Sequence, residues 1–168
     1  EMCIRDSAYT QGNKDGRNTL YCVNAKTGDI VWKHSYPCEK APKFFDGGSR
    51  STPTIKDGLL YLCSHEGDFY ALDAKSGSIL WTKNILKDFQ GKRPMWGYSG
   101  SPLISGGNII IETGSPTGSL ICVKTENGEL VWKAGDSEAG YASPILNESN
   151  EILIFNEFGL MIHDFKTG

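Results

Sequence analysis

The sequence lacks the features that mark several common classes of protein. Its formal net charge is -3, with 17 Lys and Arg against 20 Asp and Glu, so it has no basic excess of the kind that binds nucleic acid. No apolar run approaches the roughly 20 residues that span a bilayer. We therefore expect no nucleic-acid partner and no membrane span in this stretch of chain.

Signatures of catalysis and of metal binding are also scarce. The three histidines are far apart in the sequence, and no G-x-S-x-G elbow, P-loop or strand-linked G-x-G-x-x-G occurs. None of the five cysteines belongs to a C-x-x-C, a C-x-x-C-H or an adjacent pair. The sequence thus predicts no metal site and leaves the catalytic residues, if any, unassigned.

What the sequence does contain is a repeat rich in β-forming residues. Its 20 glycines stand in turn-like contexts between short runs of Val, Ile, Leu, Tyr and Trp, which favours an all-β chain. One phrase recurs, as LYCVNAKTGDIVW, FYALDAKSGSILW, LICVKTENGELVW and LMIHDFKTG. The first three copies end at Trp32, Trp81 and Trp132, spaced 49 and 51 residues apart, and the last ends at Gly168. Periods of this size indicate a repeat architecture.

Each copy predicts four short antiparallel strands, which is the content of one β-propeller blade. In the second copy the runs STPTI (51–55), LLYLCS, DFYALDA and SILWTKN are separated by the turn signals KDG, HEG and AKSG. Phe69 and Ala71 alternate with Tyr70 and Leu72, so we expect both faces of this sheet to be buried by neighbouring sheets. We interpret the tryptophan as packing between adjacent blades, with its indole N–H bonded to one polar partner.

The second copy also carries the residues of a known motif. ALDAKSGSILW fits A-x-D-x-x-x-G-x-x-x-W and resembles the tryptophan-docking repeat of propellers like those of pyrroloquinoline quinone (PQQ) dehydrogenases. The second copy matches at all four positions, Ala71, Asp73, Gly77 and Trp81. The first copy matches at Gly28 and Trp32, the third at Gly128 and Trp132, and the last at Asp164 and Gly168. Cys22 and Cys122 stand where the second copy has Ala, so we interpret them as small buried side chains. Asn24 and Lys124 replace the Asp.

The resemblance implies a ring of about eight blades, so we expect this chain to be a fragment of a β-propeller. It would hold two complete four-stranded blades, at 49–86 and 98–136, and two partial blades, at 8–38 and 141–168. Residues 1–7 (EMCIRDS) do not fit the repeat and resemble a translated sequencing adaptor, so we expect them outside the fold. The remaining blades are then the first partners of this chain. The resemblance also implies export to the periplasm or beyond.

Two long loops combine cationic and aromatic side chains on the face where propellers usually meet ligands. These are Lys43, Phe44, Phe45 and Arg50 in the loop 36–50, and Arg93, Trp96 and Tyr98 in the loop 85–100. Loops of this length are commonly functional, and Arg can pair an anionic group while Trp or Tyr stacks on a planar one. The loops therefore predict a pocket for a small-molecule or protein ligand. The alternative is that Phe44, Phe45 and Trp96 fill the gaps between blades while the charged side chains are solvated.

Further candidates lie where second strands end. His65 and Glu66 could form a site pair in the turn 64–68, and the alternative is a turn on a polar surface. Glu66, Glu112 and Glu157 could line a channel, although spacing alone cannot pair them.

Three functional hypotheses follow. The first is a PQQ-like propeller that acts as a ligand- or protein-binding scaffold, for which an outer-membrane assembly lipoprotein with the same repeats is the family precedent. The second is a quinoprotein dehydrogenase that oxidises an alcohol or sugar by hydride transfer to calcium-polarised PQQ. The resemblance implies Asp, Asn and Glu calcium ligands for such an enzyme, and many members carry adjacent cysteines at the cofactor; neither set is assignable here. PQQ and calcium are thus expected only under this hypothesis. The third is carbohydrate or polymer binding through the aromatic loops.

Overall fold

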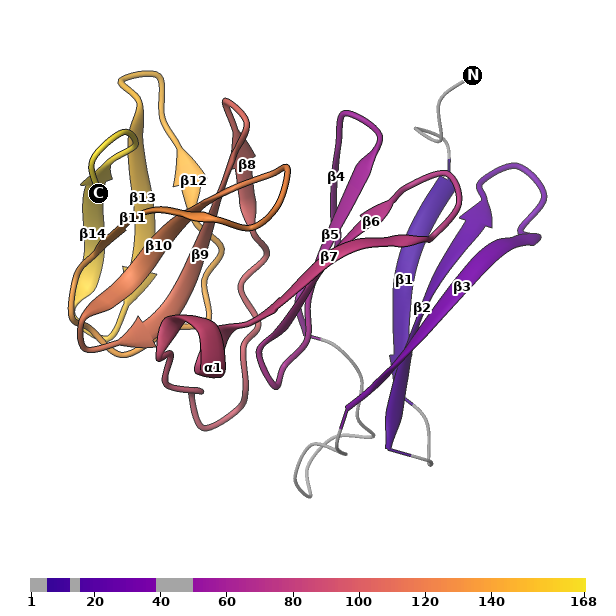
Figure 1. Ribbon diagram of the computed structural model, residues 1–168, viewed down its shortest axis with the longest axis horizontal. Helices are drawn as coiled ribbons and strands as arrows, with labels where there is room; N and C mark the ends of the chain where they lie inside the picture. The colour runs from indigo at the N-terminus through magenta and orange to yellow at the C-terminus, as the bar shows by residue number, and fades with distance from the viewer. Residues whose placement is uncertain (1–5, 13–15, 39–49) are drawn as a thin grey trace.

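The computed structural model describes residues 6–12, 16–38 and 50–168, and these form four antiparallel β-sheets that stand side by side (Figure 1). The two middle sheets have four strands, in the orders β4-β5-β6-β7 and β11-β10-β9-β8, and the outer two have three. The sheets follow one another in space as they do in the chain, as the blades of a propeller do. The prediction of an all-β propeller fold with two complete and two partial blades is confirmed, and the partial blades each have three strands.

The strands are short, in line with the spacing of the turn signals. They are β1 (Asp6–Gly12), β2 (Arg17–Asn24) and β3 (Ile30–Pro37); β4 (Thr54–Lys56), β5 (Leu59–Cys63), β6 (Asp68–Asp73) and β7 (Ile79–Asn84); β8 (Leu103–Ser105), β9 (Asn108–Ser115), β10 (Gly118–Lys124) and β11 (Leu130–Ala134); and β12 (Ile145–Leu146), β13 (Glu151–Asn156) and β14 (Gly159–Asp164). One short helix, α1 (Ile85–Phe89), follows β7. Within the described ranges no helix is long and apolar enough to cross a membrane.

Two boundaries differ from the predicted ones. β4 begins at Thr54 rather than at residue 51, because Pro53 has no N–H to donate to a strand ladder. β1 begins at Asp6, and the backbones of Asp6 and Ser7 pair with Asn24 and Val23. The first strand therefore includes the last two residues of the segment 1–7, which was expected outside the fold.

Glycines close the hairpins where the turn requires a positive φ. The two-residue loop between β4 and β5 has φ values of 52° at Asp57 and 77° at Gly58, the signature of a type I′ turn. Gly77 has a φ of 72° and precedes a bulge at Leu80 in β7, because Leu72 pairs with Ile79 and Ala71 with Trp81. The predicted turns at KDG and AKSG are thus confirmed.

The Asp of the repeat holds the turn before the tryptophan. Asp73 Oδ1 accepts the N–H of Ser76 at 2.7 Å. In the first copy Asn24 Oδ1 accepts the N–H of Thr27 at 3.1 Å. An amide oxygen therefore replaces the carboxylate without loss of the turn, whereas the ammonium group of Lys124 in the third copy cannot accept such a bond.

Each of the three repeat tryptophans, Trp32, Trp81 and Trp132, docks on the turn of the following blade. Trp81 Nε1 donates to the backbone oxygen of Thr125 at 2.9 Å, and a Cβ atom on Gly128 would lie only 2.9 Å from the Trp81 ring. The same hydrogen bond joins Trp32 to Ala74 at 3.0 Å and Trp132 to Phe165 at 3.1 Å. The predicted packing between blades and the polar partner of the indole are both present. The Gly that each tryptophan contacts belongs to the next copy of the motif, not to its own.

Buried clusters fill the spaces between successive sheets. On β6, Phe69 and Ala71 belong to the cluster between the second and third sheets, whereas Leu72 lies in the cluster toward the first sheet and Tyr70 packs against it. The predicted burial of both faces is therefore confirmed. Cys22 and Cys122 are buried as expected. Cys3 lies outside the described residues.

Candidate functional site

The connections at one edge of the sheets bring most of the predicted loop residues together. The end of β3, the β5–β6 turn and the long β7–β8 connection that includes α1 all lie at this edge, the lower one in Figure 1. We call it the loop face. Of the two long loops, the structure describes the second in full, whereas Lys43, Phe44 and Phe45 of the first lie outside the described residues.

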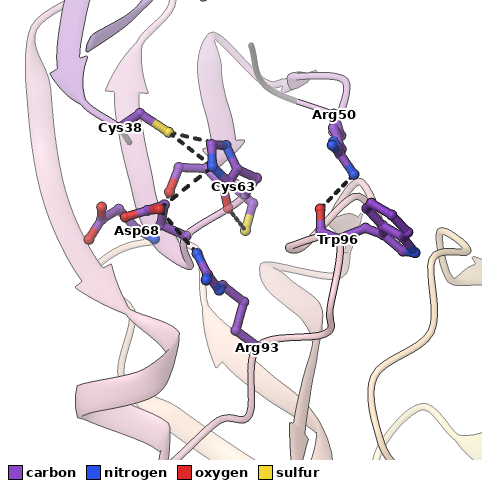
Figure 2. A network of polar contacts seen from close by, with 9 residues as sticks. Cys38, Arg50, Cys63, Asp68, Arg93 and Trp96 are labelled. Atoms are coloured by element: carbon purple, nitrogen blue, oxygen red, sulfur yellow. Dashed lines mark hydrogen bonds and ion pairs between the residues drawn. The ribbon is translucent and has the colours of Figure 1, made fainter. Parts of the chain in front are cut away.

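A line of polar contacts runs through the loop face and ends at a thiol (Figure 2). Arg93 Nη1 donates to Glu66 Oε1 at 3.1 Å, and the same carboxylate oxygen lies 3.6 Å from Nε2 of His65. The other ring nitrogen of His65, Nδ1, lies 3.2 Å from Sγ of Cys38. His65 and Glu66 therefore lie next to each other, and their contacts join the end of β3 to the β7–β8 connection; that they form a site pair stays a prediction.

His65 is buried, with 3% of its surface exposed, so the alternative of a turn on a polar surface is wrong for this residue. The reason is the following loop, which folds back over it. The backbone oxygen of His65 accepts the N–H of Tyr98 at 2.9 Å. A Cβ atom on Gly97 would lie 2.6 Å from the same oxygen, so only glycine allows this close approach.

Cys38 is the member of this line that the sequence analysis missed. Burial raises the pKa of its thiol to about 12, and the nearby carboxylates of Glu66 and Asp68 act in the same direction. The thiol is therefore protonated at neutral pH. Nothing local in the sequence singles out Cys38, because its contact with His65 joins residues on different sheets.

Arg50 and Trp96 meet in a second contact of the loop face (Figure 2). Arg50 Nη1 donates to the backbone oxygen of Trp96 at 2.7 Å, and the N–H of Trp96 points to the hydroxyl oxygen of Tyr141 at 3.4 Å. Within the segment that they hold, 80% of Met95 and 37% of Trp96 are exposed. The guanidinium group of Arg50 thus bonds to the loop itself, which presents apolar side chains to solvent.

Tyr98 does not belong to the exposed part of this loop. It is buried in the cluster between the second and third sheets, and its hydroxyl group donates to the backbone oxygen of Thr113 at 2.8 Å. Burial raises the pKa of this phenol. Tyr98 is therefore a core residue here and is not placed to stack on a ligand at the surface.

The three carboxylates proposed to line a channel have separate environments. Glu66 pairs with Arg93, and Glu157 Oε1 accepts the N–H of Glu138 at 3.1 Å. Glu112 lines a cavity of about 20 Å³, room for about one water molecule, and burial raises its pKa to about 7 against an opposing hydrogen bond from Gly140. The structure therefore does not unite them in one site.

The described residues do not fit a calcium ion with its quinone. Within 6–12, 16–38 and 50–168, no three His, Cys, Asp or Glu side chains lie where they could hold a metal ion together. Glu66 and Glu112 are engaged by Arg93 and by the backbone of Gly140. We therefore derive no reaction step through PQQ from these residues.

Successive antiparallel sheets, each joined to the next by a tryptophan-to-turn contact, define a β-propeller. Comparison with known families agrees: a family model described as outer membrane protein assembly factor BamB matches residues 16–168. The chain belongs to this family of PQQ-like repeat propellers.

The relatives of the chain have several different functions. It is 41% identical over 70 residues to a tetrathionate hydrolase of Acidianus ambivalens, covering 39% of this chain and 13% of the relative. It is 29% identical over 170 residues to the quinoprotein alcohol dehydrogenase PedH of Pseudomonas putida, covering 96% and 27%. The crystal structure of BamB from Moraxella catarrhalis superposes with a TM-score of 0.64 at 22% identity, over 96% of this chain and 43% of that one. The chain thus spans less than half the length of these relatives, and the last likeness shows the fold alone.

Proposed function

We propose that this chain is part of a propeller scaffold that binds a protein or small-molecule ligand on its loop face. The observation that carries the proposal is that Met95 and Trp96 are exposed on the β7–β8 connection, whose backbone is held by a hydrogen bond from Arg50. Large apolar side chains on a rigid base are typical of binding surfaces, because binding then costs little conformational entropy.

Three contacts support the rigidity of this connection. Arg50 bonds the backbone oxygen of Trp96, Tyr98 bonds the backbone of His65, and Arg93 pairs with Glu66. All three join the connection to other loops or to the core, so the exposed side chains between them are held in place before a ligand arrives.

Selection of peptides from a phage-displayed random library tests this proposal. Enriched peptides should lose binding to a Met95→Ala, Trp96→Ala double variant. They should keep binding to a control variant with Ile145→Ser and Ile162→Ser, which changes an apolar surface on the last sheet away from Met95. The opposite pattern, or no enriched peptide, would contradict binding at the loop face.

Further blades are the second class of partner that we propose. The face of the last sheet that points away from its neighbour carries Ile145, Phe155, Leu160 and Ile162, each more than half exposed. Ile145 and Ile162 flank Leu153 in the strand register, and Phe155 is opposite Leu160, so they form one apolar surface. In the second and third sheets the corresponding face is covered by the next sheet. A further four-stranded blade matches this surface.

A quinoprotein dehydrogenase is the second candidate function, because the match to PedH covers 96% of this chain. In such an enzyme PQQ would accept hydride from an alcohol or sugar. Addition of PQQ and calcium, followed by gel filtration and a dye-linked alcohol assay, would favour this candidate if PQQ absorbance and turnover remain with the protein. For the third alternative, a carbohydrate ligand, Trp96→Ala should weaken retention on immobilised glycans.

A further inference from the structure

We propose that the pocket beside Met95 on the loop face binds an arginine side chain of a protein partner. The pocket has a volume of about 450 Å³ and lies where the β7–β8 connection, the β11–β12 connection and the β13–β14 turn meet. A pocket of this size holds a small ligand or a few side chains of a peptide. The inference rests on the protein-binding form of the function proposed above, because it names the chemistry that such a partner presents.

Hydrogen bonds between the three connections form the pocket before a partner arrives. The N–H of Glu138 donates to Oε1 of Glu157 at 3.1 Å, which joins the β11–β12 connection to the β13–β14 turn. The hydroxyl group of Ser99 donates to the backbone oxygen of Tyr141 at 3.1 Å, which joins the β7–β8 connection to the β11–β12 connection. Because the walls are already in place, binding costs little conformational entropy.

The walls of the pocket suit the long stem and the flat cationic head of arginine. Pro94, Met95 and Ala139 are apolar residues of the lining, and Tyr141, which is 49% exposed, belongs to the same lining. A methionine side chain adapts its shape to an aliphatic stem, and a guanidinium group stacks on an aromatic face. The apolar part of the pocket therefore matches arginine better than it matches a small, strongly hydrated cation.

The charged residues of the lining are both acidic. They are Glu138 and Glu157, and no Lys or Arg is among the described residues that line the pocket. Lys92 pairs with Glu138 from outside the lining. Glu157 forms no ion pair with any residue that the structure describes. The pocket thus keeps a negative charge that a guanidinium group would complement and that an acidic side chain would not.

The contact of Lys92 with Glu138 gives this proposal a distinctive consequence. Both side chains are largely exposed, 62% for Lys92 and 59% for Glu138, and an ion pair between exposed groups is weak. An arriving guanidinium group therefore competes with the ammonium group of Lys92 for the same carboxylate. Removal of that ammonium group should strengthen the binding of arginine, whereas removal of the carboxylate of Glu157 should weaken it.

The test uses the peptides that a phage-displayed random library yields against this chain. Enriched peptides whose binding depends on Met95 should share an arginine next to an apolar residue. One such peptide, synthesised with a fluorescein label, should bind about fivefold more weakly when citrulline replaces that arginine, because citrulline keeps the shape of the side chain and removes its charge. Fluorescence anisotropy measures the binding of both peptides.

Three variants of the chain complete the test. Glu157→Gln should weaken binding of the arginine peptide about fivefold, Lys92→Gln should strengthen it about threefold, and neither should change binding of the citrulline peptide. The amide oxygen of Gln can still accept the N–H of Glu138, so the wall of the pocket is kept. Glu148→Gln is the matched control: it makes the same charge change in the β12–β13 turn, at the other end of β13, and should leave both affinities unchanged.

The outcomes separate this inference from the function on which it rests. Enriched peptides that need Met95 and Trp96 but carry no basic residue would support the binding face and overturn the arginine pocket. Equal binding of the arginine and citrulline peptides, or weaker binding of the arginine peptide to the Lys92→Gln variant, would overturn the pocket as well. A library that yields no enriched peptide would contradict the proposed function and this inference together.

Discussion

The indole ring of Trp81 packs so closely on Gly128 that a Cβ atom added there would lie 2.9 Å from Cζ3 of the tryptophan. The two residues belong to successive copies of one motif, on different sheets. The glycine and the tryptophan of the motif therefore act in pairs between blades, because the glycine of one copy leaves room for the tryptophan of the preceding copy.

The first prediction concerns the tryptophan. Trp81→Ala should lower the free energy of unfolding by about 3 kcal/mol, because the ring is packed against the core and its N–H bonds Thr125. Trp96→Ala, at a partly exposed loop position, should change it by less than about 0.5 kcal/mol. Denaturant titration measures both. Equal losses would mean that the docked ring contributes no more than a surface one.

The second prediction separates steric contact from backbone strain. Gly128→Ala and Gly28→Ala introduce a side chain at nearly the same positive φ, 71° and 78°, but only the first meets a tryptophan. The two should share a strain cost of about 1 kcal/mol, and Gly128→Ala should lose at least about 1 kcal/mol more. Thermal unfolding of the two variants gives the difference directly. If they unfold alike, the Gly-to-Trp contact is not a constraint.

The third prediction concerns the turn. Asp73→Ala removes the acceptor for the N–H of Ser76 and should cost about 1 kcal/mol, whereas Asp73→Asn should cost clearly less, because Asn24 already holds the same turn in the first copy. Urea titration of the pair tests this. A larger loss for Asn than for Ala would show that the charge, rather than the acceptor, is required.

The fourth prediction is a pH dependence that comes from Glu112. Its pKa is raised from 4.5 to about 7 in the folded chain, so the folded state binds more protons than the unfolded state in this interval. Stability should therefore fall as the pH rises from 4.5 to 7, by up to about 3 kcal/mol, and stay low above that. Melting temperatures across this range should decline less in the Glu112→Gln variant than in the unaltered chain, because the amide stays neutral. The exposed control Glu126→Gln should show the same decline as the unaltered chain.

The hairpins and the four-stranded pattern of the repeat could be predicted from the sequence. Turn residues such as Gly77 and Asp73 act on backbone within a few residues of themselves, so their spacing predicts the hairpins and the four-stranded pattern. The alternation on β6 predicts burial on both faces for the same reason. Pairing of Trp81 with the following turn could also be expected, since only a neighbouring blade offers a carbonyl oxygen at that place.

The arrangement of the candidate site residues could not be predicted from the sequence in the same way. Composition indicated that Arg50, Arg93, Trp96 and Tyr98 formed a ligand pocket, yet Tyr98 is in the core, and Arg50 bonds the backbone of its own loop face. Whether an aromatic ring stacks on a ligand or fills a gap depends on what lies across the junction. That information is not present in either loop alone.

The amino-acid sequence by itself determined the strands, the turns and the order of the blades, because these depend on interactions between residues close together in the chain. Only the tertiary structure decided that the thiol of Cys38 meets the imidazole of His65 and that Met95 and Trp96 face solvent. Such contacts arise where loops from different sheets converge, and the curvature and packing of whole blades set that convergence.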